Sequence, residues 1–403
     1  MELNAAALPQ ATTASPSADV IIVGAGPAGM SLALSLARLG LRITLLERLD
    51  ERAVAEPQDD GREIALTHES MRILDRLGVC SGWTGAEMSP IREAHVYNGR
   101  SPRFLGFGAD AAAGVEPLGW LVANHRIRRE LHRRLREQHA IRLLCGRQVV
   151  ECRTEAQQAA VRTAADGWIH APLLIAADSR FSELRRAMGI GAQMRDFGSS
   201  MLVVRAEHDR PHRNVAMEWF DYGHTIAALP LHGQVSSLIL TLPGAEAERL
   251  GAAPAQLQQR LNRWLQGRLG EVRLCSPAHR YPLIGVYAHR FAGRRFALAG
   301  DAAVGMHPVT AHGFNFGLSG QQLLASAIAS QLESGGDIAA EAALVRYERE
   351  HRRRTWPLFQ ATNAIAALYS SDSALARLGR SALLGLSRNL DPLRRAIAAE
   401  LRA

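Results

Sequence analysis

The sequence predicts an α/β fold in which a parallel-sheet domain carries an inserted antiparallel β-sheet and is followed by a C-terminal helical tail. Three observations predict this fold. Residues 18–48 read as strand, glycine-rich turn, helix and strand, which is the repeating unit of a parallel sheet. Between residues 195 and 243, short segments alternate between apolar and polar residues, as antiparallel strands do. A buried-strand pattern returns near residue 295, and the chain from about residue 340 reads as helix.

The first unit is the clearest. Val20 to Val23 form a continuous apolar run, which is typical of a parallel strand covered on both faces. Pro27 suits the first turn of a helix, and Gly40 can end that helix. Ile43 to Leu46 form the second buried strand. The other expected elements are helices at 65–78, 124–138 and 253–270, a buried strand at 172–178, and a tail helix kinked or broken at Pro357.

These patterns divide the chain into four parts. The expected division is a disordered lead (1–17), a discontinuous parallel α/β domain (18–92, 119–194 and 278–340), a β-rich substrate domain (93–118 and 195–277) and a helical segment (341–403).

Composition excludes several functions. The net charge is +8, but every basic side chain is arginine, because the chain has no lysine. A Walker P-loop, a Schiff base and a lysine nucleophile are therefore excluded, and a base-composition bias explains the high pI without a nucleic-acid partner. The four cysteines form no CxxC pair and the histidines show no zinc-motif spacing, so we expect no metal site. The N-terminus lacks signal-peptide features and no segment is apolar enough to span a membrane, which predicts a cytoplasmic protein.

A glycine-rich turn predicts dinucleotide binding. Gly24, Gly26 and Gly29 match G-x-G-x-x-G, and the turn follows a strand and opens a helix. The glycines allow close approach of a pyrophosphate, which the helix N-terminus attracts. Glu47 ends the second strand, where a carboxylate would bind a ribose hydroxyl and favour FAD or NAD over NADP. The alternative is a glycine turn required only for packing of the helix on the strand.

A second motif discriminates between the two dinucleotides. Gly300 and Asp301 end a buried strand, and Pro308, Gly313 and Asn315 follow. In this motif the chain resembles the FAD-dependent aromatic hydroxylases of the p-hydroxybenzoate hydroxylase group. The resemblance implies that Asp301 binds the ribityl chain of FAD and that the segment from Pro308 to Asn315 runs beside the flavin ring. A helix beginning there would also direct free N–H groups at the reduced flavin.

The same resemblance assigns further residues. "AADSRFSELRR" resembles the family's third motif, which starts at Asp178 and contacts FAD and the nicotinamide cofactor; Ser179 stands where the family has glycine. Arg62 resembles the flavin-proximal arginine of the family, and Arg126 resembles the arginine that reaches the FAD phosphates. For each arginine, a solvated surface position is the alternative.

The tail narrows the resemblance. From residue 346 onward it is similar to the ubiquinone-biosynthesis hydroxylases, and among them to the UbiM-like branch. This implies an FAD-dependent monooxygenase that hydroxylates a prenylated phenol or quinol precursor through a flavin C4a-hydroperoxide, with oxygen and with NAD(P)H as a transient reductant. His312 stands where these enzymes usually have glutamine, and it is our candidate catalytic residue for proton flow beside the flavin. The alternatives are a flavin-dependent prenyl-chain reductase and a non-catalytic FAD-bound subunit of a quinone-synthesis complex.

A lipophilic substrate also raises the question of where the enzyme collects it. Leucines alternate with arginines between residues 375 and 388, which predicts peripheral contact with the inner face of a membrane. The alternative is that these leucines pack on the FAD-binding domain.

Overall fold

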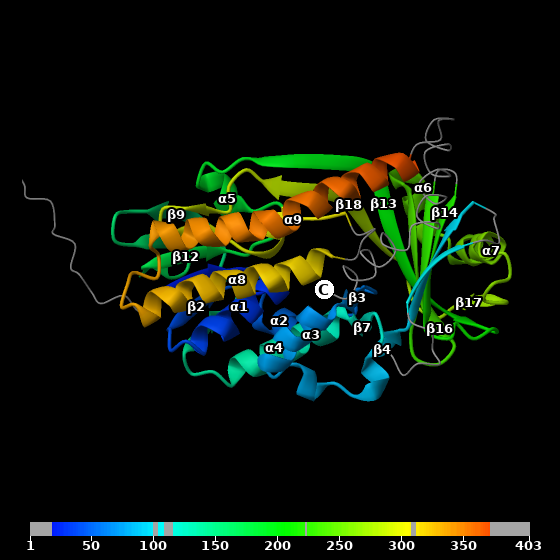
Figure 1. Ribbon diagram of the computed structural model, residues 1–403, viewed down its shortest axis with the longest axis horizontal. Coiled ribbons are helices and arrows are strands. Elements are labelled where there is room, and N and C mark those ends of the chain that lie inside the picture. Colours follow the sequence, from blue (N-terminus) through cyan, green and yellow to red (C-terminus); the bar gives the residue numbers. More distant parts are fainter. Residues whose placement is uncertain (1–17, 100–103, 109–115, 222–223, 308–311, 371–403) are drawn as a thin grey trace, which may run out of the picture.

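The computed structural model describes residues 18–99, 104–108, 116–221, 224–307 and 312–370 (Figure 1). The predicted fold class is confirmed: a parallel sheet with helices adjoins a large, mostly antiparallel sheet, and a long helix follows. None of the helices within these ranges is long and apolar enough to span a bilayer. None of the side chains described groups into a cluster of His, Cys, Asp and Glu that could hold a metal ion.

The parallel sheet has the strand order β19-β20-β12-β1-β2-β8. Four adjoining pairs are parallel, from β20 through β12, β1 and β2 to β8, so the carboxyl ends of these strands lie along one edge. The bounds are β1 (Val20–Val23), β2 (Ile43–Leu46), β8 (Ile141–Leu144), β12 (Leu173–Ala176), β19 (Ala292–Gly293) and β20 (Phe296–Leu298). All residues of β1, β2 and β12 are buried, as their apolar sequences predict, and Thr44 of β2 is the one polar residue among them.

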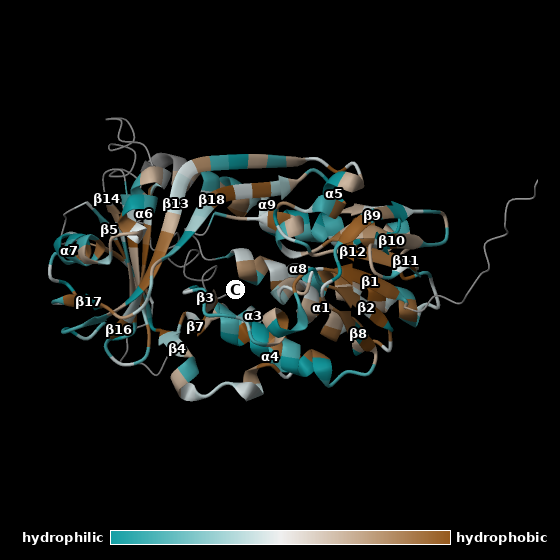
Figure 2. Cartoon of the chain, turned by 180° about the vertical axis from the view of Figure 1, so that it is seen from behind, coloured by the Kyte–Doolittle hydropathy of each residue, from teal (hydrophilic) through white to brown (hydrophobic). Residues whose placement is uncertain are grey.

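Helices cover one face of this sheet and a small antiparallel sheet covers the other. The helices that pack together are α1 (Pro27–Ala37), α4 (Asn124–Arg136), α8 (Gly313–Glu333) and α9 (Glu341–Ser370). The small sheet consists of β9 (Val149–Thr154), β10 (Ala159–Thr163) and β11 (Gly167–Ala171). Figure 2 shows the contrast that results: the strands of the parallel sheet are strongly hydrophobic, whereas most residues of α4 are hydrophilic.

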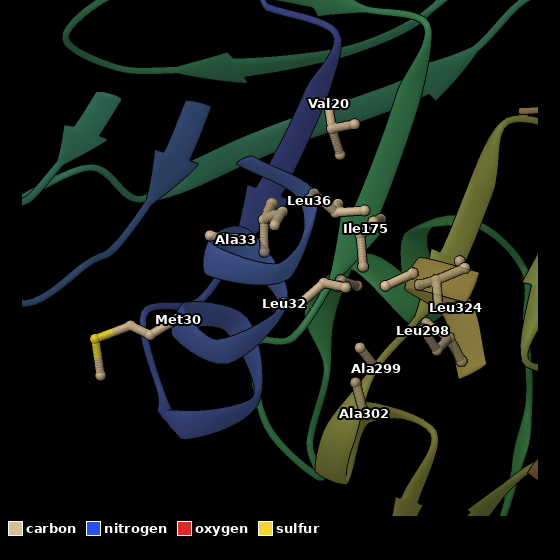
Figure 3. Packing of buried hydrophobic residues seen from close by; sticks show 14 of the residues in the cluster. Val20, Met30, Leu32, Ala33, Leu36, Ile175, Leu298, Ala299, Ala302 and Leu324 are labelled. Atoms are coloured by element: carbon tan, nitrogen blue, oxygen red, sulfur yellow. The ribbon is translucent and has the colours of Figure 1, made fainter. Parts of the chain in front are cut away.

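The core between α1, α8 and the parallel sheet is closely packed (Figure 3). Leu32 and Leu36 of α1 lie beside Ile175 of β12, and Leu298 and Leu324 continue the cluster from β20 and α8. All five side chains are fully buried, and each contributes about 1.5–3 kcal/mol through removal of apolar surface from water. This packing fixes α1 and α8 against the sheet edge from which the candidate site is built.

The large sheet has the order β21-β18-β13-β16-β15-β14-β5-β6, and β17 pairs with β13. Its pairs are antiparallel except β14 with β5. The bounds are β5 (Glu93–Asn98), β6 (Phe104–Gly108), β13 (Ala192–His208), β14 (Val215–Asp221), β15 (His224–Pro230), β16 (Val235–Pro243), β17 (Val272–Leu274), β18 (His279–Ala288) and β21 (Val304–Gly305). Helices α6 (Gly244–Gly251) and α7 (Pro254–Trp264) accompany this sheet.

A third layer lies between the two main parts. It contains β3 (Glu63–Leu66), β4 (Ser89–Ile91) and β7 (Gly119–Ala123), in the order β3-β7-β4. Figure 1 places these strands between the helices of the parallel-sheet domain and the large sheet. The remaining short elements are α2 (Glu51–Ala55), α3 (His68–Arg76), α5 (Glu183–Ala187), and the 3-10 turns η1 (Cys80–Gly82), η2 (Gly85–Glu87) and η4 (Gly300–Ala302).

Several expected boundaries differ from the structure. The helix expected over 65–78 begins at His68, because Ala65 and Leu66 belong to β3 and the Thr67 side chain caps the helix. Helix α7 ends at Trp264, before the expected end at residue 270. Helix α9 continues through Pro357, so the helix is not broken there, and the kink expected as the alternative stays a prediction. Because β18 pairs along β13, we propose to assign residues 279–288 to the substrate domain as well.

Candidate active site

Four segments meet at the carboxyl edge of the parallel sheet. The glycine turn follows β1, Glu47 follows β2, Asp178 follows β12, and Gly300 and Asp301 follow β20. Gly24 and Asp301 are 277 residues apart in the sequence (301 − 24), and the parallel strand order brings their motifs together. In open α/β sheets this edge is where ligands bind.

The three glycines of the turn have different physical requirements. Gly24 has φ +107°, and a Cβ there would lie 2.3 Å from the carbonyl oxygen of Ala177. A Cβ on Gly29 would lie 1.9 Å from the Gly24 carbonyl oxygen. The protein itself therefore requires glycine at both positions. At Gly26, by contrast, no described atom lies within 4 Å of a Cβ, and φ is −74°.

The open space at Gly26 argues for a ligand rather than for packing. Gly26 is the N-cap of α1, and no side chain caps that helix and no acidic residue lies in its first turn. Pro27 occupies the first turn, as the sequence predicts. The uncapped N–H groups of α1 thus face a space that only a small backbone leaves free, which is the geometry that a pyrophosphate requires.

Glu47 is held in position by the backbone of the site. Its Oε2 atom accepts a hydrogen bond from Ala25 N at 2.7 Å, and its Oε1 atom accepts one from Leu49 N at 3.0 Å. The first bond ties the carboxylate directly to the glycine turn. Each carboxylate oxygen has a second lone-pair site, so Glu47 retains capacity for ribose hydroxyls.

Gly300 and Asp301 approach α1 from the other side of β1. Gly300 has φ +59°, and a Cβ there would lie 2.6 Å from the Ala28 Cβ atom. The Asp301 Oδ2 atom accepts a hydrogen bond from Arg180 Nη2 at 3.1 Å, and the Asp301 side chain remains 39 % exposed. The arginine thus orients a partly exposed carboxylate beside the start of α1, where it can accept further hydroxyl hydrogen bonds.

The third motif connects the end of β12 with the segment that follows β20. Asp178 Oδ2 accepts a hydrogen bond from Glu183 N at 2.9 Å at the start of α5, whereas its Oδ1 atom is buried without a partner among the described residues. The fully buried Arg185 donates a hydrogen bond from Nη1 to the Ala302 carbonyl oxygen at 3.0 Å. Ser179 has φ +102°, a value that suits glycine. The glycine of the family motif therefore has a backbone reason, and serine at this position is strained.

The start of α8 adjoins the layer of β3. The Asn315 Nδ2 atom donates to the Ala65 carbonyl oxygen at 2.9 Å, and its Oδ1 atom accepts from Thr67 N at 3.3 Å. Asn315 therefore joins α8 to the β3–α3 connection and shapes the predicted flavin site. No described atom lies within 4 Å of a Cβ on Gly313. Pro308 lies outside the described residues.

His312 is the N-cap of α8, and its side chain is 8 % exposed. Within the described ranges, neither ring nitrogen has a hydrogen-bond partner. Its ring lies 5.9 Å from that of Phe316, centroid to centroid. Buried polar atoms are nearly always hydrogen-bonded, so the two unpartnered nitrogens leave His312 able to pair with a ligand or an ordered water.

The two predicted arginines lie elsewhere around the site. Arg62 pairs with Asp60, with 2.5 Å between Nη2 and Oδ2, and its guanidinium lies 5.2 Å from the ring centroid of Tyr281 on β18. Arg126 pairs with Glu87 of η2. Both arginines have protein partners, so their assignment to the cofactor stays a prediction.

Two residues were missed by sequence reasoning. Arg128 lies two residues after Arg126 in α4. Burial lowers the pKa of its guanidinium, which also interacts electrostatically with Glu47, Asp60 and Arg62. Among the described residues it makes no hydrogen bond or ion pair, so it is a candidate for binding the phosphates. The abundance of arginine in α4 concealed it. His307 precedes Pro308, and burial, with a contribution from Arg195, lowers its pKa to about 4.

Comparison with known proteins identifies the family. The family described as FAD binding domain matches residues 17–362. A ubiquinone hydroxylase, UbiM of Neisseria meningitidis, is 41 % identical over 387 residues, which cover 95 % of this chain and 84 % of the relative. UbiL of Rhodospirillum rubrum, also a ubiquinone hydroxylase, is 34 % identical over 94 % of this chain and 88 % of the relative.

The chain belongs to the FAD-dependent ubiquinone hydroxylase family. Its structural neighbours agree on the fold. p-Nitrophenol 4-monooxygenase PnpA of Pseudomonas putida has a TM-score of 0.77 at 18 % identity, covering 96 % of this chain and 98 % of that one. PqsL of Pseudomonas aeruginosa, a probable FAD-dependent monooxygenase, has a TM-score of 0.73 at 21 % identity, covering 88 % and 97 %.

The residues at the sheet edge fit FAD, which is the cofactor of this flavin monooxygenase. The uncapped helix and the open space at Gly26 suit the pyrophosphate. The anchored carboxylate of Glu47 suits the adenosine ribose, and the partly exposed carboxylate of Asp301 suits the ribityl hydroxyls. His312 supplies the unpartnered buried nitrogens at the start of α8.

Proposed function

We propose that this enzyme hydroxylates the aromatic ring of a prenylated phenol or quinol precursor of ubiquinone. The observation that carries the proposal is the cradle at the sheet edge, in which Gly26, Glu47 and Asp301 converge. Its ubiquinone hydroxylase relatives match nearly the whole chain, which supports the same reaction here. Bound FAD supplies the redox chemistry: once reduced by NAD(P)H, it activates oxygen.

The chain's own residues contribute position and electrostatics. The N-terminus of α1 attracts the pyrophosphate, and Glu47 and Asp301 orient the two sugar-like parts of the cofactor through hydroxyl hydrogen bonds. The N-terminus of α8, which no side chain caps, would offer free N–H groups and a positive partial charge to a reduced flavin held beside it. The Arg180 to Asp301 contact keeps the carboxylate oriented while the cofactor binds.

His312 is our candidate for proton transfer beside the flavin ring. The buried imidazole has no competing partner among the described side chains, so a ring nitrogen is available to a cofactor or substrate oxygen. Glutamine, the usual family residue at this position, offers a donor and an acceptor of similar reach.

The test is oxygen incorporation. Purified enzyme, FAD and NADH are incubated with a 2-prenylphenol in detergent under oxygen-18 gas, and the product is analysed by mass spectrometry. We expect one labelled oxygen atom in the ring and oxygen uptake matched to NADH oxidation. A prenyl-chain reductase would consume NADH without oxygen and saturate the chain, and a non-catalytic subunit would do neither.

We further propose that the enzyme collects this substrate at a lipid surface, because a polyprenylated phenol is barely soluble in water. The leucines and arginines that would make the contact, between residues 375 and 388, lie outside the described residues. Each arginine near an anionic bilayer adds about 1 kcal/mol, which salt screens. Co-sedimentation with anionic liposomes should therefore decrease at high salt and after removal of residues 371–403. Equal sedimentation of an FAD-loaded truncation would contradict the proposal.

A further inference from the structure

Glu218 is an acidic residue in the middle of the large sheet. It lies on β14, paired in register with Val96 of β5 on one side and Ala227 of β15 on the other. The strand reads Val-Ala-Met-Glu-Trp-Phe-Asp, so Glu218 is the acid at the centre of an otherwise largely apolar strand.

The two faces of β14 have different surroundings. Met217 and Trp219 belong to the core between the sheet and α7. Ala216 points to the opposite face and packs against a cluster formed by Ile91, Leu118 and Leu121 from the β3-β7-β4 layer and its approach. Because side chains alternate along a strand, Glu218 shares the face of Ala216. Its carboxyl group therefore faces the side on which the FAD-binding part of the molecule lies.

Nothing within the described residues compensates this carboxyl group. No hydrogen bond or ion pair to Glu218 occurs among them, and its neighbours on the same face, Ala216 and Phe220, are uncharged. Burial raises its pKa to about 8, and no charged group contributes to that shift. The side chain is nevertheless partly exposed, so it is not sealed in the core. An uncompensated acid at such a position costs stability, which favours a functional reason for it.

The charged groups of the same face lie farther along the sheet. Arg205 on β13 is three strands away in the order β13-β16-β15-β14, and it is paired with Asp59 and Glu63. His279 lies at the end of the row that runs from Glu218 through Ala227 and across β16 and β13 to β18. Neither group faces Glu218 directly, so the carboxyl group titrates as an isolated acid.

We propose that Glu218 accepts the proton of the substrate's phenolic hydroxyl during ring hydroxylation. In this step the phenol O–H bond breaks, its electron pair stays on the phenol oxygen, and the proton bonds to a carboxylate oxygen of Glu218. The ring becomes richer in electrons and attacks the electrophilic oxygen more readily. The proton then leaves to solvent through the partly exposed side of the carboxyl group. The inference rests on the proposed function, since it assumes a phenol as substrate.

The acidity of Glu218 is suited to this role. A general base is most effective when its pKa lies near the working pH, because it is then both unprotonated in part and basic enough to take a proton. An ordinary glutamate would be ionised at neutral pH but far too weak a base for a phenol of pKa near 10. Burial on this sheet face corrects that mismatch.

The test compares the wild type with Glu218→Gln, which preserves shape and removes the base. Hydroxylation is measured at saturating 2-prenylphenol and NADH between pH 6 and 10. We expect wild-type turnover to rise with pH as the carboxyl group of Glu218 ionises, with a midpoint near pH 8, and the Gln variant to lose that transition. Hydroxylation should fall about 100-fold to 10,000-fold in the variant, while FAD content stays unchanged.

The matched control is Glu207→Gln, which removes an exposed acid of the same large sheet and should leave the pH profile and turnover unchanged. If Glu218→Gln does not fold, Glu218→Asp replaces it and should retain the pH-dependent transition at reduced turnover. Unchanged turnover and an unchanged pH profile in Glu218→Gln, with a wild type that hydroxylates the probe, overturn the Glu218 inference alone. A wild type that leaves 2-prenylphenol without labelled oxygen at every pH overturns the proposed reaction.

Discussion

Replacing Ser179 by glycine should stabilise this enzyme. Ser179 has φ +102°, beyond the left-handed region that serine tolerates, and it lies directly after Asp178 at the end of β12. A non-glycine residue held in such a conformation costs about 1–3 kcal/mol. Relief of this strain is partly offset, by about 0.5–1 kcal/mol, because glycine loses more backbone freedom on folding than serine does. The net expected increase in the free energy of unfolding is about 1–2 kcal/mol.

The assay is urea unfolding of the holoenzyme, followed in parallel by far-ultraviolet circular dichroism and flavin fluorescence. We expect Ser179→Gly to raise the midpoint urea concentration with an unchanged slope, which indicates a change of stability rather than of the unfolded state. FAD affinity and turnover should stay at wild-type levels, because the substitution adds no group that contacts the cofactor.

Two variants control for this reasoning. Ser179→Ala keeps a Cβ at the same φ and should give no gain. Ser182→Ala removes the side chain that caps α5, where Ser182 Oγ accepts from Arg185 N at 3.0 Å, and should cost about 1 kcal/mol. A midpoint for Ser179→Gly at or below that of the wild type would refute the strain argument.

The remaining predictions concern the cofactor and the two buried titratable residues. Gly26→Ala should fold normally but bind FAD more weakly, whereas Gly29→Ala should fail to fold because its Cβ would meet a carbonyl oxygen; circular dichroism and flavin titration separate the two, and equal FAD affinity in Gly26→Ala would contradict a pyrophosphate at that position. Asp301→Ala should weaken FAD binding by about 1–3 kcal/mol, measured by titration of apoprotein, and full retention of FAD would remove Asp301 from the site. His312→Gln should keep coupled turnover, while His312→Leu should keep FAD and release peroxide in place of product; equal coupling in the Leu variant, measured by oxygen uptake with catalase, would reduce His312 to packing. Because the folded pKa of Glu218 is raised above its ordinary value of 4.5, wild-type stability should fall relative to Glu218→Gln as pH rises from about 4.5 to about 8 and the difference should then stay constant; parallel urea curves over that whole range would show that the carboxyl group is not desolvated.

Much of the FAD-binding part was predictable because its strands are buried on both faces. Val20–Val23 and Ile43–Leu46 have the predicted bounds, since a mainly apolar run flanked by charged residues or glycine leaves little choice of boundary. The motif residues at the strand ends converge for the same reason: parallel strand order is sufficient to bring Glu47 and Asp301 to one edge.

The features that were not predicted form through contacts between segments that are distant in the sequence. Ala65 and Leu66 read as the start of a helix, but pairing with β7 extends them as a strand, and no local signal reports that partner. Glu218 was missed because a single acid in a strand ordinarily marks a solvated face, and only the neighbours Val96 and Ala227 show otherwise. The strain at Ser179 is likewise invisible in sequence, because serine is common in turns.

The long strand β13 has a mechanical consequence. It extends from Ala192, beside α5, to His208 in the large sheet, and Figure 1 shows it crossing the top of the molecule between the two parts. Its register with β18 shifts between Asp196 and Ser200, so the ladder is weakest there. Phe197 lies within that interval and its ring is 4.6 Å from that of His307, just before the Pro308 segment. Bending between the two halves is therefore expected at this irregularity and is transmitted through Phe197 to His307, which precedes the segment that we propose lines the flavin. On that proposal, the mutual tilt of the halves and the fit of the cofactor cannot vary independently.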